Sequence, residues 1–238
     1  LAHRWLAVLS ILMIMGAALW AALKSQTKLG VIWPLLLAAQ TSMTQAIIGS
    51  GFIIYQGDKA FLGVLHMGMA LLALAAMVMA STSAFYARRS QAERRKPGMR
   101  SPFARLTFAT LIVVFVLLIR GNLLSATGAG AACLGWPLCG GSLPNNIVAW
   151  FAFSHRLIVI GAGLLVLLQF LLAWRTQRSQ PVLLPAATGV FLLTLGQIFI
   201  GAVKVSRGYP LDLVGLHAAA SSGLWALQVL LVVAAYFV

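Results

Sequence analysis

Acidic side chains are almost absent from this chain, with 3 among 238 residues, and residues of either charge make up only 8%. Soluble domains carry about 25% charged residues, so this scarcity argues against an ordinary soluble fold. Hydrophobic residues make up 61% of the chain, and the mean hydropathy is +0.98. The composition therefore indicates an all-helical protein that crosses a membrane several times.

The scarcity of acids and cysteines also limits the metal sites that the chain can build. The acids Asp58, Glu93 and Asp212 lie outside the interiors of the apolar segments. A non-haem iron site with two histidines and a carboxylate is therefore disfavoured. A tetrahedral zinc site is disfavoured as well, because no cysteine or acid accompanies the histidines to complete its ligand set.

Long apolar runs recur along the whole sequence, and each is near the 20 residues that a helix needs to span a bilayer. Backbone groups in lipid must bond within their own segment, so each run is expected to be helical. The predicted spans are residues 4–23, 31–54, 60–82, 104–123, 148–174, 182–203 and 212–236.

The net charge of +14 would suit a nucleic-acid partner, but the position of the charge argues against one. Many of the basic residues fall in one stretch with Glu93 as the single acid, namely Arg88, Arg89, Arg94, Arg95, Lys96, Arg100 and Arg105. By the positive-inside rule, loop 83–103 is cytoplasmic, and loops 55–59, 124–147 and 204–211 lie on the outer side.

The 4 histidines of the chain form two matching pairs. A shift of 152 residues aligns His3 with His155, Arg4 with Arg156, Gln45 with Gln197, and Gly49 with Gly201, and a shift of 151 aligns His66 with His217. The chain therefore contains an internal repeat, and the predicted topology puts all four histidines at the outer ends of their helices.

The second repeat has a leading helix, 104–123, and a long outer loop that the first repeat lacks. We expect about 50 further residues, one helix and its loop, to precede residue 1, which would give eight helices. The expected architecture is two four-helix bundles related by a pseudo-twofold axis along the membrane normal. The expected divisions are an N-terminal half at 1–85, a basic linker at 86–102 and a C-terminal bundle at 103–238.

Paired imidazoles inside a helical bundle suit haem iron, because facing helices supply axial ligands from opposite sides. Arginines can meet the haem propionates, and the candidates are Arg4, Arg156 and Arg120. Lys204 and Arg207 fit either this role or ordinary interfacial anchoring. Gln45 and Gln197 are polar residues inside spans, expected to bond across helices or to a cofactor. Gly49 and Gly201 would allow close approach of a helix or a flat ring.

Cys133 and Cys139 lie in the predicted outer loop, where an oxidising compartment would favour a disulfide. The residues between them include Gly135 and Pro137, which make a compact closed loop easy to form. The pair fits both a structural clip and a redox-active or delivery-linked role.

These elements together resemble the haem A synthase family, whose members convert haem O to haem A. The resemblance rests on His-Arg at 3–4 and 155–156, Leu-His at 65–66 and 216–217, Cys133-Leu-Gly-Trp-Pro-Leu-Cys139, and the Gln and Gly elements. It covers essentially the full chain and implies eight helices in two pseudo-symmetric halves.

The resemblance also implies roles for the residues. His155 and His217 would hold a low-spin haem b, and His3 and His66 would hold substrate haem O, whose methyl group is oxidised to a formyl group. Cys133 and Cys139 would form the outer-loop disulfide. The family places a catalytic Glu three residues before the first histidine, which here falls upstream of residue 1, so the catalytic residue is unassigned; the equivalent C-terminal position is Ala152.

The implied setting is the plasma membrane of a prokaryote, with haem O synthase as donor and a terminal oxidase as the recipient of haem A. No nucleic acid is expected, and formation of a homo-oligomer is left open. Two other functions remain: a quinol-linked dihaem b electron-transfer subunit, and a membrane thiol–disulfide oxidoreductase at the cysteine pair.

Overall fold

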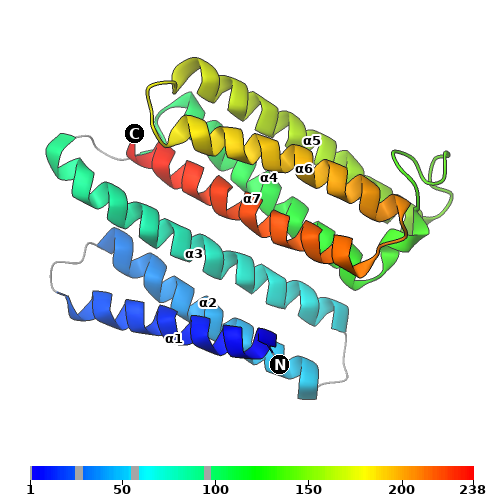
Figure 1. Cartoon of the computed structure of the whole chain (residues 1–238), viewed down its shortest axis with the longest axis horizontal. Coiled ribbons are helices and arrows are strands. Elements are labelled where there is room, and N and C mark those ends of the chain that lie inside the picture. The colour runs from blue at the N-terminus through cyan, green and yellow to red at the C-terminus, as the bar shows by residue number, and fades with distance from the viewer. Residues whose placement is uncertain (1, 25–28, 55–58, 94–97) are drawn as a thin grey trace. The chain divides into compact units, whose positions relative to one another are not determined.

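A computed structural model describes residues 2–24, 29–54, 59–93 and 98–238. Within these ranges the chain is helical and contains no strand. The helices are α1 (Ala2–Leu23), α2 (Leu29–Ile54), α3 (Lys59–Glu93), α4 (Pro102–Ala126), the short 3₁₀ helix η1 (Ala129–Ala132), α5 (Ile147–Thr176), α6 (Leu183–Ser206) and α7 (Leu211–Phe237). Figure 1 shows them along the chain.

The described residues include 7 helices that are long and apolar enough to cross a membrane. Each of these helices covers one of the predicted spans, and only α6 starts a residue later than its span. The all-helical, multi-span prediction is therefore confirmed. The agreement follows from the bilayer, because a segment of this length in hydrocarbon can satisfy its backbone groups only as a helix.

One boundary differs from the sequence prediction by more than about three residues, namely the end of α3. Residues 83–93, expected to be loop, continue α3 as far as Glu93. This extension is rich in Ala, Arg, Gln and Glu, which favour helix, so the helix can continue where the apolar residues end. The predicted basic loop 83–103 is thus partly helical, and its residues 94–97 lie outside the described part.

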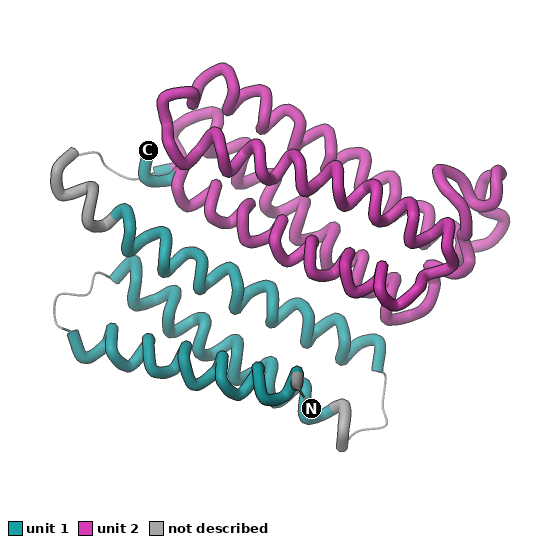
Figure 2. The backbone as a smooth tube through the Cα atoms, in the orientation of Figure 1, with its two compact units in different colours: residues 1–98, 236–238 teal, residues 99–235 magenta. Residues whose placement is uncertain are grey.

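The chain divides into two compact units, coloured separately in Figure 2: residues 1–98 with 236–238, and residues 99–235. In unit 1, α2 packs against both α1 and α3. Its core cluster consists mostly of alanines: Ala18, Ala21, Leu35, Ala39 and Ala80. Small residues at helix interfaces let backbones approach closely, which is how helices associate in lipid.

Unit 2 contains α4, η1, α5, α6 and most of α7. Helix α5 packs against α4, α6 and η1. Ser101 caps the start of α4 through a 3.0 Å hydrogen bond from the Ala104 amide, and Asn146 caps α5 through a 2.9 Å bond from the Ala149 amide. The starts of α5 and α7 and the loop between α4 and α5 lie at one end of this unit (Figure 1).

Candidate functional site

In each unit, the sequence-predicted histidines lie toward one end. His3 is in the first turn of α1 and His66 about two turns into α3, and these helix starts share one end of unit 1 (Figure 1). His155 and His217 lie about two turns into α5 and α7. His3 is exposed, whereas the other three imidazoles are half-buried.

In unit 1, the imidazole of His66 lies against α2. Its Nδ1 is 3.1 Å from the backbone oxygen of Gln45, and its Nε2 is 3.5 Å from the side-chain nitrogen of Gln45. Gly49 permits this approach, because a Cβ there would stand only 3.2 Å from His66 Cε1. A histidine whose Nδ1–H donates to a backbone carbonyl keeps its Nε2 lone pair for a metal, which is the usual arrangement around metal-bound histidines.

In unit 2, both imidazoles also lie against glycines. A Cβ at Gly121 of α4 would stand 3.1 Å from His155 Cε1, and one at Gly201 of α6 would stand 3.5 Å from His217 Cε1. Gly49 and Gly201, the glycines that the sequence analysis singled out, thus each lie beside an imidazole, in tighter contact at Gly49 than at Gly201. The two histidines of unit 2 lie within electrostatic reach of one another.

Several polar atoms in this part of unit 2 are buried without a hydrogen-bond partner in the described structure: Nδ1 of His155, Nδ1 of His217, Nε of Arg120 and Oε1 of Gln197. Unpartnered buried polar atoms are rare in folded proteins and call for an explanation. These atoms gather at one end of unit 2. They mark a polar site at which the described protein atoms do not supply every hydrogen bond.

Gln197 is oriented differently from its repeat equivalent Gln45. The Gln197 amide donates to the backbone oxygen of His217 and to the hydroxyl of Ser221, each at 2.9 Å. Gln45, by contrast, directs its amide to a ring nitrogen of His66. Both predicted glutamines therefore bond across helices, but to different atoms.

Cationic side chains surround His155. Arg120 and Lys204 and Arg156 are all within electrostatic reach of it. Arg120 donates to the hydroxyl of Ser154 and, at 3.1 Å, to the backbone oxygen of Phe151, and its guanidinium lies 4.3 Å from the centre of the Phe151 ring. These positive charges at the buried end of a bundle would favour an anionic group.

Arg4, Arg207 and Lys204 were also predicted as candidate cations. Arg4 and Arg207 are exposed. Lys204, expected in an outer loop, is instead in the last turn of α6, because that helix continues three residues beyond the predicted span.

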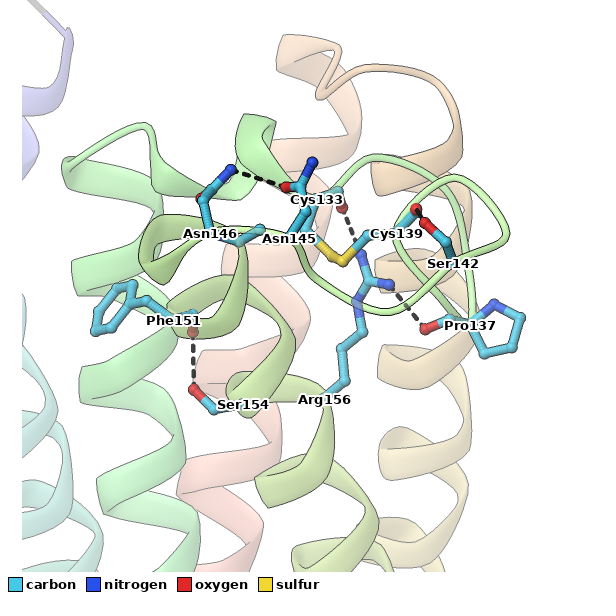
Figure 3. Close-up of a disulfide and its surroundings, with 10 residues drawn as sticks. Cys133, Pro137, Cys139, Ser142, Asn145, Asn146, Phe151, Ser154 and Arg156 are labelled. Atoms are coloured by element: carbon cyan, nitrogen blue, oxygen red, sulfur yellow. Dashed lines mark hydrogen bonds between the residues drawn. A yellow bond between two sulfur atoms is a disulfide. The ribbon is translucent and has the colours of Figure 1, made fainter.

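The loop between α4 and α5 is closed by a disulfide between Cys133 and Cys139, which confirms the expected bond. Arg156 holds this loop: its guanidinium donates to the backbone oxygen of Cys133 at 2.6 Å and of Pro137 at 2.8 Å (Figure 3). A planar guanidinium can donate two such bonds at once. Arg156 was predicted as a candidate for binding a propionate. In this structure it anchors the disulfide loop to α5.

Tyr209, in the short α6–α7 connection, was not singled out by the sequence. Its backbone has a φ of 64°, in the left-handed region, and follows Gly208 at 72°. Its hydroxyl lies where any side chain at Gly130 of η1 would clash, so this connection packs against the loop between α4 and α5. Burial raises the pKa of the Tyr209 hydroxyl above its usual value, with the charge of Arg156 opposing the shift.

Gly121 and Ser221 were also missed. Gly121 lacks a counterpart in the first repeat, so the 152-residue comparison could not mark it. Ser221 could have been found from its place four residues after His217, where the first repeat has Ala70 after His66.

Among the described residues, no group of three or more His, Cys, Asp or Glu side chains is placed to hold a bare metal ion. The available donors are single imidazoles: three of them lie against glycines, and His155 and His217 also have cations within electrostatic reach. Fold and site together define a polytopic helical membrane protein with imidazole donors inside its helical units.

The chain belongs to the family described as cytochrome oxidase assembly protein, whose model matches residues 1–229. Among similar proteins, the heme A synthase of Geobacillus kaustophilus is 29% identical over 224 residues, which cover 92% of this chain and 69% of that protein. The heme A synthase of Geobacillus thermodenitrificans is 26% identical over 176 residues, 73% of this chain and 55% of that protein.

A shorter match joins the chain to a protoheme IX farnesyltransferase of Haloquadratum walsbyi, 31% identical over 110 residues, 45% of this chain and 23% of that protein. The matched stretch covers 23% of the farnesyltransferase, 55% of the G. thermodenitrificans protein and 69% of the G. kaustophilus protein, so the chain spans only part of the length of these relatives.

Proposed function

We propose that this chain acts as a haem A synthase, oxidising a methyl group of haem O to the formyl group of haem A. The observation that carries the proposal is the set of imidazoles at one end of each unit, each of the three half-buried rings lying against a glycine of a neighbouring helix. Membership of the family and the named activity of the relatives support the same reaction.

Unit 2 suits a resident haem b between His155 and His217. Nδ1 of both histidines and Nε of Arg120 are buried without a hydrogen-bond partner in the described structure, which supports a site that a bound group completes. Arg120 and Lys204 would pair with the propionates, since both are near His155. Haem b, when bound, would supply one-electron transfer to and from the reaction.

Unit 1 would receive substrate haem O between His3 and His66. Here the chain's own contribution is orientation: the Gln45 carbonyl fixes the ring of His66 through Nδ1, which directs Nε2 toward a ligand. His3 and Arg4 are exposed at the start of α1, where they remain accessible to an incoming haem.

We assign no residue of this chain to proton handling. The position equivalent to the family's catalytic Glu in unit 2 is Ala152, which is buried in a cluster with Cys133 and Ala149. A carboxylate at position 152 would be desolvated beneath the disulfide, which is costly without a paired charge.

The proposed setting is the plasma membrane of a prokaryote, with the histidine ends of the helices outward as the positive-inside rule requires. Haem O would come from a haem O synthase, and haem A would go to a terminal oxidase. The similarity to a stretch of a protoheme IX farnesyltransferase supports a close connection between the two enzymatic steps.

Extraction of the pigments from the purified protein tests the proposal. We expect haem b together with haem O or haem A, because one unit retains its haem and the other exchanges substrate for product. Two haem b per chain and no haem O or A would favour a dihaem electron-transfer subunit instead. Absence of haem would rule out both.

A further inference from the structure

Gln45 and Gln197 occupy the same place in the two repeats, yet their side chains make different contacts. Both lie on the helix before a histidine, at corresponding positions of α2 and α6. The amide of Gln45 reaches a ring nitrogen of its histidine, whereas the amide of Gln197 reaches a backbone oxygen. Only the first contact involves an atom with which the imidazole could bind iron.

In unit 1 the amide nitrogen of Gln45 lies 3.5 Å from Nε2 of His66, while Nδ1 of the same ring is 3.1 Å from the Gln45 backbone oxygen. A carbonyl oxygen only accepts, so Nδ1 must carry the ring proton and Nε2 must carry the lone pair. The amide NH₂ therefore donates toward the same lone pair that iron would need.

In unit 2 the amide of Gln197 is bound elsewhere. It donates to the hydroxyl of Ser221 and the backbone oxygen of His217, both at 2.9 Å, and so does not compete for the imidazole. Ser221 lies one turn after His217. The residue one turn after His66 is Ala70, whose side chain has no hydrogen-bonding group.

We propose that Gln45 is a positioning residue that competes with haem iron for Nε2 of His66 and thereby makes the haem of unit 1 exchangeable. In unit 2, Ser221 binds the equivalent Gln197 amide and keeps it away from the imidazole of His217, so the haem of unit 2 is retained. This inference rests on the proposed function, because it assigns the substrate to unit 1 and the resident haem to unit 2.

The proposed competition is between two states of His66: Nε2 bound to the Gln45 amide, and Nε2 bound to iron. Iron ligation in unit 1 must displace an existing contact, and the 3.5 Å separation marks a weak bond that an iron–nitrogen bond can replace. A competitor of this kind reduces the apparent affinity for haem in proportion to the fraction of molecules in which Nε2 is free to bind iron. An enzyme that releases its product gains from that weaker binding, whereas a resident electron carrier does not.

The test measures the equilibrium partition of haem O between the intact purified protein and apomyoglobin, read from the visible spectrum. Gln45→Leu should raise the affinity for haem O about twofold, the effect of removing one hydrogen bond at the weak end of the usual net range. Ala70→Ser should raise it in the same direction by drawing the Gln45 amide away, and it should have no added effect in the Gln45→Leu background.

Gln40→Leu is the matched control, because Gln40 is on the same helix and its amide bonds to Thr44 within that helix. Ser221→Ala is the converse variant and should loosen haem b in unit 2. Unchanged or weaker haem O binding in Gln45→Leu would overturn the inference.

The two failures can be told apart. If His66→Ala leaves haem O binding intact, the proposed function is at fault, since His66 is then not a substrate ligand. If His66→Ala abolishes haem O binding but Gln45→Leu leaves the affinity unchanged, the function stands and the role given to Gln45 is wrong.

Discussion

At the scale of single residues, the glycines beside the imidazoles differ in how much space they leave. A Cβ would come to 3.2 Å from His66 Cε1 at Gly49 and to 3.1 Å from His155 Cε1 at Gly121, but to 3.5 Å from His217 Cε1 at Gly201. The first two distances are tighter than ordinary contact, while the third is normal van der Waals packing. The three positions therefore predict unequal tolerance of alanine.

Gly49→Ala and Gly121→Ala should push the imidazole by a few tenths of an ångström and lower the haem content of their own unit several-fold. Gly201→Ala should keep its haem and gain about 0.5–1 kcal/mol of stability, because alanine is the better helix former. Haem content and thermal unfolding would be measured for each. Gly161→Ala is the control, since nothing lies within 4 Å of its Cβ position; equal haem loss at all four sites would contradict this account.

Arg156 anchors the disulfide loop through two charge-assisted hydrogen bonds. Arg156→Lys removes the forked geometry, and each such bond contributes about 1.5–3 kcal/mol. We expect the Cys133–Cys139 bond to be reduced at least about tenfold faster, because the loop opens more often. Timed reduction followed by maleimide labelling measures the rate. The exposed Arg207→Lys is the control, and identical rates in the two variants would show that Arg156 does not hold the loop.

At the scale of helices, unit 2 contains a buried amide pair in its core. Gln169 of α5 and Gln228 of α7 are fully buried and bond to each other in both directions at 3.1 and 2.9 Å, and Gln228 also donates to the Thr107 backbone oxygen of α4. The pair thus joins three helices of the bundle. The equivalent positions of unit 1 are the apolar Ala17 and Met77, which pack against its core cluster.

Replacing one member of this pair should destabilise unit 2, because the other amide is then left buried without its partner. Gln228→Leu is expected to cost about 1–2 kcal/mol, in the upper range of interhelical hydrogen bonds in membranes. The double variant Gln169→Leu with Gln228→Leu should cost less than the sum of the two single changes. Unfolding in mixed detergent measures these costs, with the exposed Gln40→Leu as control; strict additivity would mean that the pair is not coupled.

The helices were predictable from the sequence to a greater extent than the site. The apolar length of a span fixes its helix, so each boundary was found to within about three residues except the end of α3, where helix-forming polar residues extend the helix beyond the apolar segment. Histidine identity and repeat spacing drew attention to the helix ends at which the polar contacts of His66, His155 and His217 occur. The contacts of Gly121, Tyr209 and the Gln169–Gln228 pair join residues distant in sequence, and no periodicity along one helix encodes them.

At the scale of the whole chain, a duplicated sequence carries two unequal units. Unit 2 has a disulfide-closed loop held by Arg156, a buried amide pair and a serine that withdraws Gln197. Unit 1 has apolar residues at the equivalent core positions and a glutamine directed at its histidine. These differences suit a retained haem in one unit and an exchanged haem in the other.

The most direct test of this division is the low-spin haem b spectrum of four alanine variants of the histidines in the intact protein. His155→Ala and His217→Ala should each abolish the low-spin haem b signal. His3→Ala and His66→Ala should leave that signal intact and stop formation of haem A. Loss of the low-spin signal in His66→Ala, or its survival in His217→Ala, would contradict the assignment of resident and substrate haem to the two units.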